Sequence, residues 1–215
     1  MACDCLGVAR MREHQRRALV RALRLVSATH WVRYRFGAVV IDAVNFVPQS
    51  RPRLFIVAIA PQLTSPAALE RSVPSSQWHP KRLVEAKLSL PTHCQERWIG
   101  WHLPTPPPRA QVFADVIETN PSDVPWHTPG ATQKLLDMMS PVNREKVFVA
   151  QRSGVQCVGA IYRRTRLGVQ RAEVRFDDVA GCLRTASGGS SRQSILVVQG
   201  ASVRSRLLST RGQHG

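Results

Sequence analysis

The sequence lacks the patterns typical of disulfide-linked, zinc-binding and membrane-spanning proteins. No secretory signal is present, and the five cysteines form no CxxC pair: Cys3, Cys5, Cys94, Cys157 and Cys182. This scatter supports neither a zinc ribbon nor a disulfide framework. No apolar run approaches the roughly 20 residues that cross a bilayer. We therefore expect a cytoplasmic protein without a membrane partner or a metal site.

Acidic residues are also scarce. The 215 residues include 14 Asp and Glu but 30 Lys and Arg, which gives a formal net charge of +16. Most of the positive residues are arginine, whose side chain is suited to bidentate contacts with phosphate and guanine. The predicted partner is a polyanion, most simply double-stranded DNA. A GC-rich genome is an alternative explanation for the choice of Arg over Lys, but it accounts less easily for the net charge.

The most informative stretch runs from residue 47 to residue 59. Gln49, Arg51 and Arg53 alternate along it, so in an extended chain their side chains point the same way. Neighbouring prolines stiffen the backbone there, and a continuous apolar run follows that is typical of a buried strand. Such a polar face suits recognition of a base edge or a phosphate. The alternative is an edge strand whose arginines lie in water.

The coarse pattern predicts an α/β fold. An amphipathic helix over 12–28 precedes apolar runs over 36–44 and 53–60, and the link between these runs is too short for a parallel crossover. We therefore expect an antiparallel pair of strands at the edge of a sheet. Residues 61–175 are rich in proline and contain four tryptophans, which favours an ordered, loop-rich region. Within it we expect helices over 80–90, 109–119 and 131–139, and short strands over 147–150 and 155–161.

Two further segments supply candidate DNA contacts. The first is a basic run that contains Arg163, Arg164 and Arg166, for which phosphate contact and a solvated charge cluster are equally supported. The second is a loop of small residues before a predicted strand over 194–198. Its backbone N–H groups and hydroxyls suit phosphates, and an ordinary hairpin loop is the alternative. Its candidate residues are Arg184, Thr185, Ser187, Gly188, Gly189, Ser190, Ser191 and Arg192.

Taken together, these segments resemble the carboxy-terminal part of a DNA cytosine-5 methyltransferase. The family's order is kept by the strand over 36–44, the Gln49-x-Arg51-x-Arg53 motif, a long variable region and the segment over 176–198. Residues 203–211 also resemble the start of the family motif Arg-x-Leu-Thr-x-Arg-Glu. The resemblance covers the chain from about residue 14 to residue 211.

The resemblance implies a fold and a role for each part of the chain. The fold would be α/β, with the edge of a Rossmann-like, S-adenosylmethionine-dependent methyltransferase sheet and a loop-rich target-recognition domain. Residues 12–60 would belong to the catalytic domain, 61–198 to the target-recognition domain, and 199–215 to a truncated return to the catalytic domain. Gln49, Arg51 and Arg53 would be supporting catalytic residues that contact a flipped cytosine.

Several family motifs are absent. The sequence contains no Pro-Cys nucleophile loop, no Glu-Asn-Val carboxylate and no Phe-x-Gly-x-Gly loop for S-adenosylmethionine. Without a nucleophile the covalent intermediate cannot form. We therefore expect a segment of an enzyme for C5 methylation of cytosine in DNA, associated with the nucleoid and inactive without a second polypeptide that carries the missing half. A non-enzymatic basic DNA-binding module and a non-functional gene remnant are the alternatives.

Overall fold

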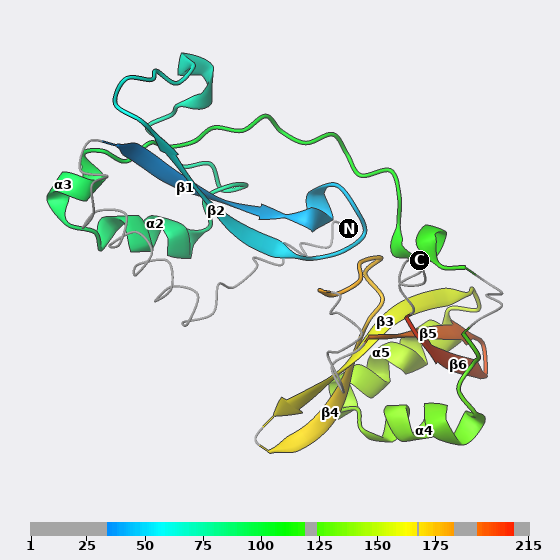
Figure 1. The fold of residues 1–215 in the computed structure, drawn as a ribbon. Coiled ribbons are helices and arrows are strands. Elements are labelled where there is room, and N and C mark those ends of the chain that lie inside the picture. Colours follow the sequence, from blue (N-terminus) through cyan, green and yellow to red (C-terminus); the bar gives the residue numbers. More distant parts are fainter. Residues whose placement is uncertain (1–33, 119–123, 167, 183–192, 209–215) are drawn as a thin grey trace. The chain divides into compact units, whose positions relative to one another are not determined.

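A computed structural model of the chain describes residues 34–118, 124–166, 168–182 and 193–208. The described residues form two compact units, each with its own core (Figure 1). The first contains residues 34–42 and 52–106, and the second contains residues 43–51 and the described residues from 107 onward. One boundary thus lies near Pro106, whereas the sequence predicted one near Pro61. The expected helix over 12–28 lies outside the described residues.

The first unit is built on two antiparallel strands, β1 (Arg35–Asp42) and β2 (Pro52–Ile59). Both strands and their antiparallel pairing confirm the prediction. On its other side, β1 bonds to a loop: Phe36 N–H donates to the carbonyl of Arg97 (3.0 Å), and Ile99 N–H donates to the carbonyl of Phe36 (2.7 Å). β1 is therefore the inner strand and β2 is the edge.

Apolar side chains cover both faces of β1. The short helices α2 (Lys81–Leu88) and α3 (Thr92–Gln95) supply the buried residues of one face, and α2 confirms the helix expected over 80–90. Tryptophans from the loop cover the other face. The two clusters are Phe36, Ala38, Leu83, Ala86, Leu90 and Cys94, and Val39, Trp78, Ile99 and Trp101. The proline- and tryptophan-rich sequence is thus ordered because its tryptophans pack against the sheet. A 3-10 turn, η2 (Ala67–Leu69), lies in the same loop.

A buried histidine in this unit makes its stability depend on pH. The His79 side chain is 8% exposed, its Nδ1 accepts a hydrogen bond from Ser75 N–H (3.1 Å), and its buried Nε2 has no partner among the described residues. Burial lowers the pKa of His79 from its ordinary value of 6.5; the hydrogen bond with Ser75 opposes this shift, and the charges of Lys87 and His102 support it. The neutral ring is therefore the form that the fold stabilises.

We expect the chain to become less stable as the pH falls below about 6.5, because the unfolded state binds the His79 proton more tightly than the folded state does. This contribution is fully present above pH 6.5 and is lost below it. The melting temperatures of the wild type and of His79→Gln, measured at about pH 7.5 and about pH 5.5, test this. The variant should show the smaller acid loss, and an equal loss in both proteins would contradict the prediction.

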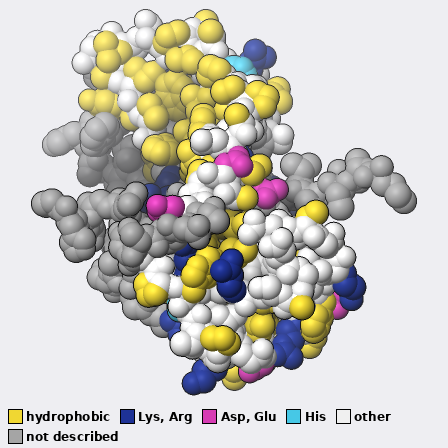
Figure 2. Space-filling model, turned by 90° about the vertical axis from the view of Figure 1, so that its right-hand side faces the viewer, with side chains coloured by type: hydrophobic (Ala, Val, Ile, Leu, Met, Phe, Trp, Pro, Cys, Tyr) yellow, Lys and Arg dark blue, Asp and Glu magenta, His cyan; other side chains and the backbone are white. Residues whose placement is uncertain are grey.

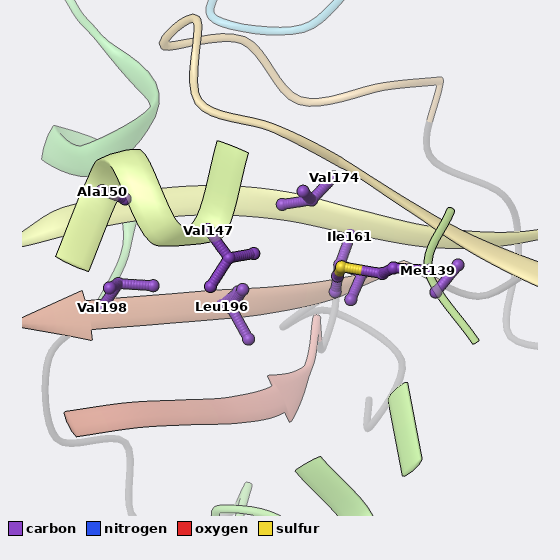
Figure 3. Close-up of a cluster of buried hydrophobic side chains, with 8 residues drawn as sticks. Met139, Val147, Ala150, Ile161, Val174, Leu196 and Val198 are labelled. Atoms are coloured by element: carbon purple, nitrogen blue, oxygen red, sulfur yellow. The ribbon is translucent and has the colours of Figure 1, made fainter. Parts of the chain in front are cut away.

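The second unit contains a four-stranded antiparallel sheet in the order β4-β3-β5-β6. Its strands are β3 (Cys157–Arg166), β4 (Val169–Arg175), β5 (Ser194–Gln199) and β6 (Ser202–Leu207). The helices α4 (Pro129–Asp137) and α5 (Pro141–Arg152) pack against one face. Figure 3 shows the shared core, which contains Met139, Val147, Ala150, Ile161, Val174, Leu196 and Val198. α4, β3 and β5 confirm the elements expected over 131–139, 155–161 and 194–198.

Two expected elements are wrong. The strand expected over 147–150 is part of the helix α5, which begins with a proline at its first position. Val147 and Ala150 are buried on one helical face while Phe148 and Val149 are exposed, a distinction that a short apolar run does not reveal. The helix expected over 109–119 is only the 3-10 turn η3 (Phe113–Val116). There Phe113 is buried, and its N–H donates to the carbonyl of Asp178 (3.1 Å).

The structure is therefore mixed α/β, with two antiparallel sheets and a few helices, as predicted at that level. None of the described helices has the length and apolar character needed to cross a bilayer.

Candidate nucleic-acid interface

Two stretches singled out by the sequence lie side by side in the second unit. Ala180 N–H donates to the carbonyl of Pro48 (2.8 Å), and Ser50 N–H donates to the carbonyl of Ala180 (2.9 Å). Gln49 thus forms a parallel bridge with Ala180. Pro48 is buried and Gln49 is half-buried. The segment with the Gln49 motif is therefore fixed beside the chain that enters the loop of small residues.

The Ala180 segment is held on the face of the sheet opposite α4 and α5. Ala180 is 2% exposed and packs with Phe113, Ala160 and Ile195. Ala160 precedes Ile161 of the helix-side core, so the two side chains point to opposite faces of the sheet. Asp178 has a positive φ of 57°, and its carbonyl is the acceptor for Phe113. Both ends of the short segment from Asp178 to Ala180 are therefore tied down.

The ends of the small-residue loop are clamped by Gln193. Its side chain is 7% exposed, and its Nε2 donates to the carbonyl of Cys182 (2.9 Å). A Cβ at Gly181 would lie 2.9 Å from that Nε2, so a larger residue there would displace the end of the Gln193 side chain. The Oε1 atom of Gln193 is buried without a partner among the described residues. The candidate residues of the loop itself, Arg184 to Arg192, lie outside the described residues.

The two arginines of the Gln49 motif are both exposed. Arg53 lies in β2, in the first unit, and its Nη1 donates to the carbonyl of Pro52 (3.3 Å). Gln49 and Arg51 belong to the second unit. A common face for all three side chains therefore stays a prediction.

The basic run is divided between the two faces of the β3–β4 hairpin. Arg163 and Arg164 are neighbours in β3, so their side chains point to opposite faces. Arg164 shares the face of Ala160 with Tyr162, and its guanidinium lies 4.6 Å from the centroid of the Tyr162 ring. Burial raises the pKa of Tyr162, so the phenol stays neutral. For Arg166 the structure describes the backbone, which pairs with Val169.

Like charges meet across this hairpin. Arg164 lies directly opposite Arg171, and both side chains are exposed. Among the described residues, Arg164 has one ion pair, a long one of 3.8 Å from Nε to Glu173, and Arg171 has none. Like charges directly opposite each other destabilise a sheet. A bound anion such as a phosphate would relieve that repulsion.

A second basic and aromatic group on the same face was not foreseen from the sequence. Arg204 and Arg206 of β6 place their guanidinium groups 4.6 and 4.8 Å from the ring centroid of Trp126. Arg206 is 4% exposed, donates to the carbonyl of Glu118, and keeps Nη1 buried without a described partner. Burial lowers the pKa of Arg206. Nearby Glu118 has the opposite effect. Arginines at alternating positions, 204 and 206, were the available signal, but no strand was predicted there and the tryptophan is distant in sequence.

Comparison with protein-family models, curated proteins and solved structures found no match to this chain. Its function is therefore inferred from its own residues. In the described parts of the chain, no group of three or more His, Cys, Asp or Glu side chains is placed to hold a metal ion.

A cavity of about 410 Å³ lies among α4, α5 and β6. Its lining mixes apolar side chains such as Leu136, Val147 and Phe148 with polar ones such as Gln133, Arg144 and Gln151. It lies apart from the basic and aromatic side chains described above, since its lining includes none of Tyr162, Arg164, Arg171 and Arg204.

Proposed function

We propose that this chain is the DNA-contacting part of a DNA cytosine-5 methyltransferase. In this proposal the chain takes part in C5 methylation only with a polypeptide that supplies the nucleophile and the cofactor loop. The observation that carries the proposal is the backbone pairing of Pro48 and Ser50 with Ala180. It joins two segments, distant in sequence, that each resemble a family motif. Basic and aromatic side chains flank the joined segments on the same sheet face.

The chemistry of the Gln49 motif agrees with such a role. The Gln49 amide offers both donors and an acceptor, which suits the edge of a base that has lost its pairing partner. Attack on C6 of cytosine moves electron density to the carbonyl oxygen of the ring, and the guanidinium groups of Arg51 and Arg53 are suited to stabilise that charge. These residues hold and polarise the base. They do not form the covalent bond.

The described residues do not fit S-adenosylmethionine. Cofactors of this kind bind where a strand enters a helix through a glycine-rich turn. Here β1 leads instead into the 3-10 turn η1 (Ala43–Asn45), whose three residues include no glycine. No step of the reaction is therefore assigned to the cofactor within this chain.

A second candidate function, a DNA-binding module without catalysis, is favoured by the hairpin. The close placement of Arg164, Arg171 and Tyr162 offers phosphate contacts and needs no complementing polypeptide. This function predicts DNA binding with no methyl transfer under any condition.

The two functions are separated by a complementation assay. The chain is mixed with a polypeptide that carries the family's Pro-Cys and Phe-x-Gly-x-Gly motifs, and transfer of a tritiated methyl group from S-adenosylmethionine to duplex DNA is measured. We expect transfer only in the mixture, and a loss of about 100-fold or more with Arg53→Ala. Arg144→Ala is the control, because Arg144 pairs with Asp137 at 2.6 Å on the helix side. Binding of DNA without any transfer would leave the non-catalytic module.

A further inference from the structure

β2 has the sequence of an inner strand but lies at an edge. Its residues, PRLFIVAI, are apolar on both faces, as is typical of strands buried within a sheet. Yet Phe55 is 47% exposed and Val57 is 45% exposed on one face. On the other face Leu54, Ile56 and Ala58 are only partly buried. Figure 2 shows hydrophobic side chains gathered over the surface of the unit that contains β1 and β2.

The backbone of β2 also has an unused edge. Phe36 and Val40 of β1 form backbone hydrogen bonds with the loops on the far side of the strand. The N–H and C=O groups of the even-numbered residues of β1 therefore point away from β2. The bonded pairs between the strands are therefore Gly37 with Val57 and Val39 with Phe55. The N–H and C=O groups that point outward from β2, with no backbone partner among the described residues, are those of Leu54, Ile56 and Ala58.

We propose that this edge pairs with β2 of a second copy of the chain, antiparallel and about a two-fold axis at Ile56. In this register Leu54 of each copy bonds with Ala58 of the other, and Ile56 bonds with Ile56. All three outward residues are thus satisfied, and Pro52, which has no N–H to donate, stays outside the ladder. The proposal does not rest on the proposed function.

The side chains favour a second copy as the occupant of this edge. In the Ile56-centred register, Phe55 of each copy lies opposite Val57 of the other, which makes one apolar cluster from the four exposed side chains. Arg53 lies opposite Ile59, so the two Arg53 side chains stand at opposite ends of the ladder and do not repel each other closely. The surface is thus complementary to itself, as a two-fold interface requires.

Cysteine cross-linking tests the register. Phe55 and Val57 of different copies form a pair without backbone bonds, with Cα atoms about 4.5 Å apart, which is within the range of a disulfide. A mixture of full-length Phe55→Cys and Val57→Cys chains should therefore give a 55–57 disulfide on oxidation, identified by peptide mass spectrometry. Phe55→Cys alone should not form a 55–55 disulfide, because that diagonal spans about 7–8 Å. Failure to form the 55–57 link, or an equal yield of the 55–55 link, would overturn the proposal.

Sedimentation equilibrium of the full chain tests the association itself. An eight-residue edge is a small interface, so we expect a dimer that dissociates on dilution. Val57→Lys should raise its dissociation constant by about tenfold or more, since the new charge would be buried against Phe55. Val73→Lys is the matched control, because Val73 is 74% exposed in the same unit, and it should have no effect. Circular dichroism checks that both variants fold. A wild type that is monomeric at every concentration, or equal weakening by both variants, would refute the pairing.

Discussion

Binding of duplex DNA should weaken steeply as salt is added, and the Arg164→Ala, Arg171→Ala double variant should lose part of that dependence. Each phosphate neutralised by an arginine adds about −0.9 to the slope of the logarithm of affinity against the logarithm of salt concentration. Arg164 and Arg171 are exposed and face each other across the hairpin, so both are available to phosphates. The double variant should therefore have a slope shallower by about two.

Fluorescence anisotropy with a labelled duplex between about 50 and 200 mM salt measures this slope; with six to ten phosphate contacts the affinity falls about 10³- to 10⁵-fold over that range. The control is the Arg144→Ala, Arg152→Ala double variant, which changes the net charge equally. Those arginines already pair with Asp137 (2.6 Å) and Glu145 (2.7 Å), so phosphates have less to gain from them. If both double variants change the slope equally, net charge alone accounts for binding and the hairpin is not the contact surface.

The strands were the most predictable part of the fold because their signals are local. Long apolar runs bounded by prolines and polar residues identified β1, β2 and β5, and the short link between the first two determined that they are antiparallel. The run at Val147 misled because four apolar residues carry no clear period. In the structure this run belongs to α5, which begins at Pro141 and is stabilised by the packing of Val147 with Leu196 and Val198.

The candidate site was less predictable because its parts meet through non-local contacts. The sequence gives both the Gln49 motif and the segment that leads to Gly181, but no local pattern pairs Ser50 with Ala180. Likewise Trp126 meets Arg204 only because β6 joins the sheet beside β5. The division of Arg163 and Arg164 between faces is different. Side chains alternate along a strand, so this division could have been predicted. It was missed because the expected strand ended at residue 161, whereas β3 ends at residue 166.

Gly37→Ala should destabilise the first unit by roughly 3 kcal/mol or more, which is over 100-fold in the unfolding equilibrium. A Cβ at position 37 would lie 2.0 Å from the carbonyl oxygen of Ile99 and 2.8 Å from Cδ1 of Trp101. The Ile99 backbone cannot easily retreat, because its N–H bonds to the carbonyl of Phe36 (2.7 Å). Relief of the clash requires the loss of that bond and the displacement of the tryptophans that cover β1.

Gly130→Ala is the matched control for Gly37→Ala. Gly130 lies in the first turn of α4, and a Cβ there would meet nothing within 4 Å, so the substitution should be neutral or stabilise by about 0.5 kcal/mol. Urea unfolding followed by tryptophan fluorescence reports on both units, because Trp78 and Trp101 lie in the core of the first unit and Trp126 packs against a core of the second. Equal midpoints for wild type and Gly37→Ala would contradict the packing of the loop on β1. A wild-type chain with no cooperative transition at all would favour the gene remnant instead. Such a remnant has no specific core, so a substitution of glycine would carry no packing penalty.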